Sequence, residues 1–155
     1  MKIVTILLGF LLLCSSNIYA EEQKFNYEGF IKDYFSAWKN SQKPKAVKED
    51  LEQYLAFLND NIGYQHLPYS NDDSRKPDGK EALRKGMSYY LGIHTEYSAK
   101  LTKYSYGHNV IILEFDTTFK GIHPDNGQEI SSTSKALEVL EIEEGKVSVI
   151  RHYSD

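Results

Sequence analysis

The chain has 155 residues, a formal net charge of −4 at neutral pH and no block of basic residues. A mildly acidic chain without a basic patch is a poor partner for nucleic acid, so we expect no nucleic-acid binding. Its twelve tyrosines make it rich in a side chain that combines an apolar ring with a polar hydroxyl, which suits both interfaces and ligand cavities.

The first twenty residues have the layout of a secretory signal peptide. One lysine precedes an apolar run over 3–13, and polar residues then lead to a small residue, Ala20. We predict cleavage after Ala20, export to the periplasm or the medium, no stable membrane insertion after cleavage, and a single mature domain over 21–155. The alternatives are an uncleaved membrane anchor and a lipoprotein acylated at Cys14, although Leu13 is an unusual residue before a lipidated cysteine.

Cys14 is the only cysteine and leaves with the signal, so the mature domain is expected to have no disulfide, no thiolate nucleophile and no cysteine metal site. The five histidines are scattered, and nothing local brings His66, Glu138 and His152 together. Nucleophile elbows, phosphate loops and dinucleotide fingerprints are also missing from the sequence. We therefore expect neither a metal nor a cofactor.

Helical periodicity dominates the first half of the mature chain. Apolar residues recur at helical spacing over 26–40 and over 46–60, which predicts two amphipathic helices. A short strand around His66 and a polar, mobile loop over 70–79 are expected next. A third helix is predicted from Asp78, with Glu81 completing a capping box, to a stop at Gly92.

From Thr95 onward the apolar residues alternate with polar ones. This period of two predicts strands over 95–105, 109–121, 129–142 and 147–155, separated by turns that include 123–128 and 143–146. Helices followed by a meander of long strands indicate an α+β fold, in which an antiparallel sheet carries its helices on one face.

Four stretches, "IKDYFSAWKNS", "FLNDNIGYQHLPY", "DGKEALRKGMSYYLG" and "KALEVLEIEEGKVSVIRHYSD", follow one another with a characteristic spacing. In this order they resemble the SnoaL-like branch of the nuclear transport factor 2-like superfamily, and the resemblance covers nearly all of the mature chain. It implies a cone-shaped roll: three N-terminal helices packed in a strongly curved antiparallel sheet that encloses a deep apolar cavity. It also implies pairing of two copies through the outer face of the sheet. Members include isomerases, cyclases, hydrolases, dehydratases and non-catalytic binding domains, so the fold alone does not give the function.

The resemblance to ketosteroid isomerase, one of these members, implies roles for three residues. Tyr34 falls at the tyrosine of the oxyanion hole, Glu138 at the neutral acid and His66 at the catalytic aspartate. Because His66 departs from the aspartate of that enzyme, steroid isomerisation itself is in doubt.

The residues themselves bear on these roles. Strand alternation places Glu138 on one face with Ala136 and Leu140, and burial among apolar side chains would raise the pKa of its carboxyl group. The alternative is a rim position in which Glu138 pairs with Arg151. His66 is either a base, since imidazole titrates near neutrality, or a core histidine bonded to a carbonyl and a tyrosine hydroxyl. Tyr34 is either a site residue or a core tyrosine.

We expect the cavity to hold a small, largely apolar or carbonyl-containing molecule. In an enzyme, the expected chemistry is cofactor-free acid–base catalysis of the isomerase, cyclase or dehydratase type, with His66 as base, Glu138 as acid and Tyr34 as oxyanion donor. A ligand carrier and a dimeric interaction module are the alternatives. The alternation does not decide whether Arg151 or His152 points inward. The ligand-binding wall is predicted to comprise Trp38, Tyr64, Met87, Tyr90, Leu91, Phe115 and His152.

Overall fold

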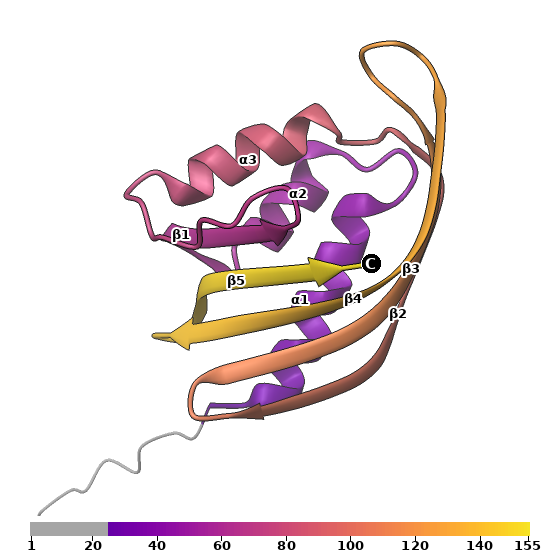
Figure 1. Ribbon diagram of the computed structural model, residues 1–155. Helices are drawn as coiled ribbons and strands as arrows, with labels where there is room; N and C mark the ends of the chain where they lie inside the picture. The colour runs from indigo at the N-terminus through magenta and orange to yellow at the C-terminus, as the bar shows by residue number, and fades with distance from the viewer. Residues whose placement is uncertain (1–24) are drawn as a thin grey trace, which may run out of the picture.

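The computed structural model describes residues 25–155 (Figure 1). The predicted signal peptide, with Cys14 and Ala20, lies outside these residues. No helix within 25–155 is long and apolar enough to cross a membrane. The elements follow the chain as α1 (Tyr27–Gln42), α2 (Lys48–Leu55), β1 (Leu58–Leu67), α3 (Gly79–Tyr89), β2 (His94–Gly107), β3 (Val110–Ile122), β4 (Glu129–Glu143) and β5 (Lys146–Ser154).

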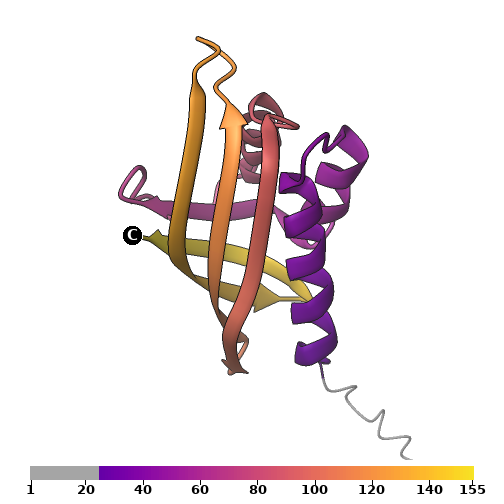
Figure 2. The same cartoon turned by 90° about the vertical axis from the view of Figure 1, so that its right-hand side faces the viewer.

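The strands form one sheet in the order β1-β5-β4-β3-β2. All neighbours are antiparallel except β1 and β5, which run parallel, so the sheet is mixed rather than purely antiparallel. The long strands β2, β3 and β4 bend around α1, and β5 runs alongside the C-terminal part of β4, with β1 beyond it at the edge (Figures 1 and 2). The predicted α+β cone is thus confirmed, with β1 as a parallel edge strand.

Local chemistry sets the helix boundaries. The Asn26 side chain accepts a hydrogen bond from the Gly29 amide (3.0 Å) and so caps α1. At the start of α2, the Asp50 carboxylate accepts a hydrogen bond from the Val47 amide (3.0 Å). The prediction of a second helix up to residue 60 is wrong: α2 ends at Leu55, and the fully buried Leu58 begins β1. Leu58 fits a helical and a strand pattern equally well, which explains the error.

The core lies between α1, α2 and the concave face of the sheet. Its largest fully buried side chains are Tyr34, Leu51, Leu55, Leu58, Ile62, Ile111, Leu113, Phe115, Leu140, Val147 and Ile150. The third helix differs, because none of its residues is fully buried. The capping box predicted at Asp78 is also wrong, since the Asp78 side chain caps nothing and Glu81 pairs with Arg84 instead. Gly79 lets α3 approach β1, because a side chain there would collide with the Ile62 carbonyl.

Candidate functional site

Strand register brings three polar residues together on the concave face of the sheet. His66 of β1 lies opposite His152 of β5, and His152 lies opposite Glu138 of β4. Residues directly opposite one another in neighbouring strands point to the same face, so the three side chains form a transverse row. We call His66, His152 and Glu138 the acid–base row. Their sequence separation of up to 86 positions hides this arrangement from any local motif.

Glu138 is the buried centre of the row, with only 4% of its surface exposed. It shares the inner face with Ala136 and Leu140, as the alternation indicated. Its Oε1 lies 3.0 Å from Nδ1 of His152, and its Oε2 accepts a long hydrogen bond (3.4 Å) from the Tyr34 hydroxyl. A carboxylate this deep needs such partners, because an unpaired buried charge is costly.

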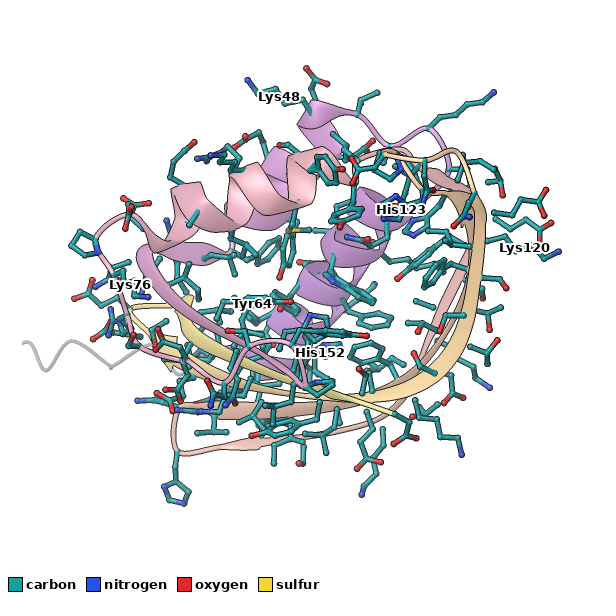
Figure 3. The ribbon with its side chains drawn as sticks, turned by 45° about the horizontal axis from the view of Figure 1, so that its top comes forward. Lys48, Tyr64, Lys76, Lys120, His123 and His152 are labelled. Atoms are coloured by element: carbon teal, nitrogen blue, oxygen red, sulfur yellow. The ribbon has the colours of Figure 1, made fainter. Side chains whose placement is uncertain are left out.

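The question of which β5 residue points inward is answered by the ion pairs of Arg151. Its guanidinium binds Asp73 (2.7 Å) and Glu141 (2.7 Å) on the other face of the sheet. Arg151 therefore does not pair with Glu138, and His152 takes the inner position. In Figure 3, His152 and Tyr64 lie in the interior, while Lys120 projects from the outer side of the sheet.

Tyr34 lies behind the row rather than on the cavity wall. The side chain is completely buried, and its hydroxyl contacts Glu138 and the Tyr54 hydroxyl (3.4 Å). Burial, reinforced by the negative charge of Glu138, holds the pKa of Tyr34 well above its usual value, so the phenol stays protonated and donates. Tyr34 is thus placed to hold Glu138, and it does not contact the cavity where an oxyanion would form.

His66 occupies the exposed end of the row. Its Nδ1 lies 3.3 Å from the Tyr64 hydroxyl, and its ring meets that of His152 edge to face with 4.5 Å between centroids. Burial lowers the pKa of His66, and electrostatic repulsion from the neighbouring His152 lowers it further, while the Glu138 carboxyl group opposes both. The imidazole of His66 is therefore neutral around pH 7, as a proton acceptor must be.

The row opens into a cavity of about 900 Å³ between the sheet, α1, α3 and the loop that follows β1. Of the wall predicted from sequence, Trp38, Tyr64, Met87, Tyr90, Phe115 and His152 line it, as do His66 and Glu138. Leu91 does not line the cavity but packs against the core. Sequence reasoning missed a further group of lining residues: Tyr54, His94, Tyr97, Thr117, Ser132 and Ser134.

The missed lining residues on β4 belong to a run in which every residue is polar. Ser131, Ser132, Thr133 and Ser134 follow one another, so no alternation marks the inner face there. The only available signal was their even spacing from Glu138: Ser134 lies four positions and Ser132 six positions before it on the same strand. Side chains an even number of positions apart on a strand point to the same face.

Although two histidines and a carboxylate meet in the row, they do not have the geometry of a metal site. Within 25–155 no three histidine, cysteine, aspartate or glutamate side chains are placed to hold a metal ion. In the row itself, Nδ1 of His152 already faces Glu138.

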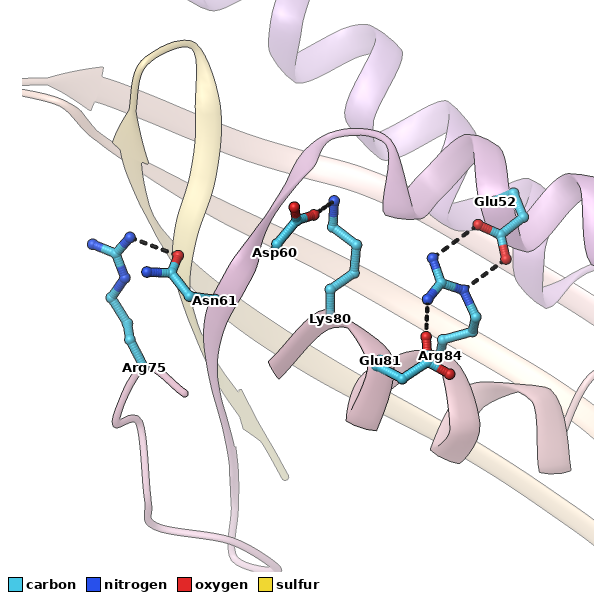
Figure 4. A network of polar contacts seen from close by, with 7 residues as sticks. All are labelled: Glu52, Asp60, Asn61, Arg75, Lys80, Glu81 and Arg84. Carbon is cyan, nitrogen blue, oxygen red and sulfur yellow. Dashed lines mark hydrogen bonds and ion pairs between the residues drawn. The ribbon is translucent and has the colours of Figure 1, made fainter. Parts of the chain in front are cut away.

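The wall opposite the sheet is α3, and surface ion pairs attach it to the body (Figure 4). Lys80 binds Asp60 of β1 (2.6 Å), and the guanidinium of Arg84 donates hydrogen bonds to both carboxylate oxygens of Glu52 on α2 (2.7 and 3.1 Å). Arg84 also pairs with Glu81 within α3. These contacts position Leu83 and Met87 over the cavity.

No family model matches the chain, and no curated protein matches it. Solved structures do share its fold. A SnoaL-like polyketide cyclase from Shewanella putrefaciens aligns with a TM-score of 0.63 and 12% identity, over 83% of this chain and 88% of that one. An LEH-like epoxide hydrolase from M. tuberculosis aligns with a TM-score of 0.59 and 16% identity, over 83% of this chain and 84% of that one.

A third structure, a protein with a ketosteroid isomerase-like fold from Catenulispora acidiphila in complex with trimethylamine, aligns with a TM-score of 0.54 and 7% identity. That alignment covers 80% of this chain and 83% of the other. Identities this low carry information on the fold, and the chemistry must come from the site. The chain has the fold of the SnoaL-like proteins in the nuclear transport factor 2-like superfamily, as its motifs indicated.

Proposed function

We propose that the cavity binds a small, largely apolar, carbonyl-containing molecule and that the acid–base row transfers protons on it without a cofactor. The observation that carries this proposal is the register that aligns His66, His152 and Glu138 on one wall of the cavity. Isomerisation, cyclisation and dehydration next to a carbonyl all need a base and an acid on one substrate, and a row of this kind supplies both.

In this proposal, neutral His66 removes a proton from the carbon next to the carbonyl. Nδ1–H of His152 donates to Glu138, so Nε2 is the ring nitrogen left for the substrate. When His152 is protonated, its imidazolium donates to the developing enolate oxygen, and Glu138 stabilises that charge. Tyr34 acts through Glu138, by holding the carboxylate in place. These roles revise those inferred from the resemblance, in which Glu138 was the acid and Tyr34 the oxyanion donor.

The structural neighbours support the class of reaction only in outline. One is a polyketide cyclase by name and another is an epoxide hydrolase-like enzyme. Both names are those of enzymes, and a cavity of about 900 Å³ in this chain has the size of a small-molecule site.

A panel of enolisable ketones tests the proposal, with turnover and affinity measured for the wild type, His66→Ala and Glu138→Gln. We expect turnover to fall by about 10²-fold to 10⁴-fold in both variants, because general acid–base catalysis contributes that much. His108→Asn is the matched control, since this histidine lies exposed in the turn between β2 and β3. Binding that both variants retain, without turnover by the wild type, would favour the carrier.

We also propose that two copies pair through the outer face of the sheet. Ile112, Leu137 and Val139 lie on that face, opposite the inward Leu113, Glu138 and Leu140, and they are only partly buried in one copy. Sedimentation equilibrium should then report a dimer for the wild type and a monomer for Val139→Lys. A monomeric wild type would contradict the pairing.

The export predicted from the signal pattern is likewise a proposal. A chain expressed in full in a Gram-negative host should be recovered outside the cytoplasm with Glu21 as its first residue. Recovery of a chain that retains 1–20, or of one acylated at Cys14, would contradict cleavage after Ala20.

A further inference from the structure

The cavity has a second polar region, remote from the acid–base row. It consists of His94 and Tyr97 on β2, Thr117 on β3, and Ser132 and Ser134 on β4. We call these five residues the distal wall. None of them contacts the row through a hydrogen bond within 25–155, and the proposed proton transfers do not use them.

His94 lines the cavity, and its contact with the backbone fixes its tautomer. Its Nδ1 lies 2.6 Å from the Gln42 carbonyl oxygen, and a carbonyl only accepts, so Nδ1 carries the proton. In the neutral ring Nε2 then has a free lone pair. Two aromatic rings pack against the imidazole: Tyr97 is stacked on it (5.1 Å between centroids) and Phe119 is tilted against it (4.9 Å).

The other members of the distal wall add hydroxyl groups. Thr117 and Ser134 share one hydrogen bond between their hydroxyls (2.9 Å). The Tyr97 hydroxyl is shielded from solvent and has no hydrogen-bond partner within the described residues. Burial, with a contribution from the charge of Glu138, raises the pKa of Tyr97, so its hydroxyl is a donor. A wall that holds an oriented acceptor and an unpartnered donor is built for a polar ligand group.

The separation of the two polar regions sets the shape of that ligand. Ser134 and Ser132 precede Glu138 by four and six residues on β4, or by roughly 13 and 20 Å along the curved strand. His94 lies farther still, because it pairs with Gly121, which in turn pairs with Ile130. Between the two regions the lining is aromatic and apolar, with Trp38, Phe115 and Ala136.

We propose that the ligand is elongated and carries a hydroxyl group at the end remote from its reacting carbonyl, and that this hydroxyl donates to Nε2 of His94 with Ser132 beside it. This inference rests on the proposed function and adds the class of substrate: a hydroxylated ketone with an apolar body long enough to reach both regions.

Two matched series of probes test the inference: linear methyl ketones from octyl to octadecyl, and the same ketones with a terminal hydroxyl. Affinities are measured by calorimetry for the wild type, His94→Phe and Ser132→Ala. We expect the terminal hydroxyl to improve the affinity of the wild type about fivefold to tenfold at one chain length, as one net hydrogen bond does. This preference should disappear in His94→Phe, which keeps an aromatic ring, and weaken in Ser132→Ala.

Ser131→Ala is the matched control, because Ser131 is the neighbour of Ser132 on the opposite face of β4. It should keep the full preference for the hydroxylated ketone, as should His152→Gln, in which only turnover is lost.

Equal affinity of the two series at every length, or a preference that survives in both His94→Phe and Ser132→Ala, would overturn the inference. If His152→Gln turned over the ketones as fast as the wild type and the wild type still preferred the hydroxylated series, the result would count against the proposed proton transfer but not against the polar ligand end. A wild type that binds no member of either series would overturn both proposals.

Discussion

The two walls of the cavity are built in opposite ways. The sheet wall carries the acid–base row, fixed by backbone pairing of β1, β5 and β4 and backed by fully buried residues such as Leu140 and Ile150. The α3 wall has no fully buried residue: Leu83 and Met87 pack against the core only partly buried, and surface ion pairs join the helix to β1 and α2. The acid–base row therefore lies on the wall that is more deeply buried, and the α3 wall is the one expected to open locally at lower cost.

The largest difference in stability between the two walls should come from truncating a core side chain next to the row. Leu140 is fully buried two residues after Glu138, so Leu140→Ala should lower the free energy of unfolding by about 2–5 kcal/mol. Urea titration measures this change. The neighbouring Val139→Ala, on the outer face, should cost much less; equal losses at both positions would contradict the assignment of the faces.

Removal of the hydroxyl that holds Glu138 should have the next largest effect. Tyr34→Phe leaves the buried Oε2 of Glu138 without its donor, and we expect a loss of roughly 1–3 kcal/mol in the free energy of unfolding. Tyr104→Phe, at an exposed tyrosine, is the control and should change little. A Tyr34→Phe variant as stable as the wild type would show that Tyr34 does not hold the carboxylate.

The depressed pKa of His66 predicts a pH dependence of stability. The unfolded chain takes up a proton at this residue near pH 6.5, whereas the folded protein does so only at a lower pH. Within this window the unfolded state binds more protons, so stability falls as the pH is lowered and is unaffected by His66 above the window. Urea midpoints between pH 7.5 and 5 should therefore fall more steeply for the wild type than for His66→Gln. Parallel slopes would contradict the lowered pKa.

The smallest effect on global stability is expected on the α3 wall. Arg84→Gln removes the double contact with Glu52, and an exposed ion pair contributes about 0.2–1 kcal/mol, less at high salt. Hydrogen exchange of the α3 amides should nevertheless become faster while β4 and β5 keep their protection. Lys103→Gln, which breaks a distant surface pair with Glu114, is the control. Faster exchange spread evenly over β4 and α3 would show that the two walls unfold together.

The sequence was sufficient to predict the fold and to single out His66, Glu138 and His152 as candidate site residues. Ordered motifs predicted the α+β cone, and clean alternation of Ala136, Glu138 and Leu140 predicted the inner face of β4. In β5 the alternation was ambiguous, because apolar residues that the structure buries occur on both faces, Val149 on the face of Arg151 and Ile150 on that of His152. The orientation of His152 therefore depended on tertiary ion pairs that no pattern along β5 encodes.

Two further features of the site were not predictable, for a similar reason. The sequence left Tyr34 open between a site residue and a core tyrosine. The periodicity of a helix gives the buried face and not the depth, so its position behind Glu138 was not predictable. Likewise, register across β2, β3 and β4 creates the distal wall from residues far apart in the chain. Both features depend on which elements pack together rather than on local pattern.

The central claim, that the acid–base row moves protons on a bound ketone, is tested most directly by deuterium exchange. A methyl ketone is incubated with the protein in D₂O, and loss of the protons next to the carbonyl is followed by NMR. The wild type should accelerate this exchange, while His66→Ala and His152→Gln should slow it by about 10²-fold or more with the ketone still bound. Exchange at the rate of the protein-free solution, with the wild type saturated with ketone, would contradict the claim.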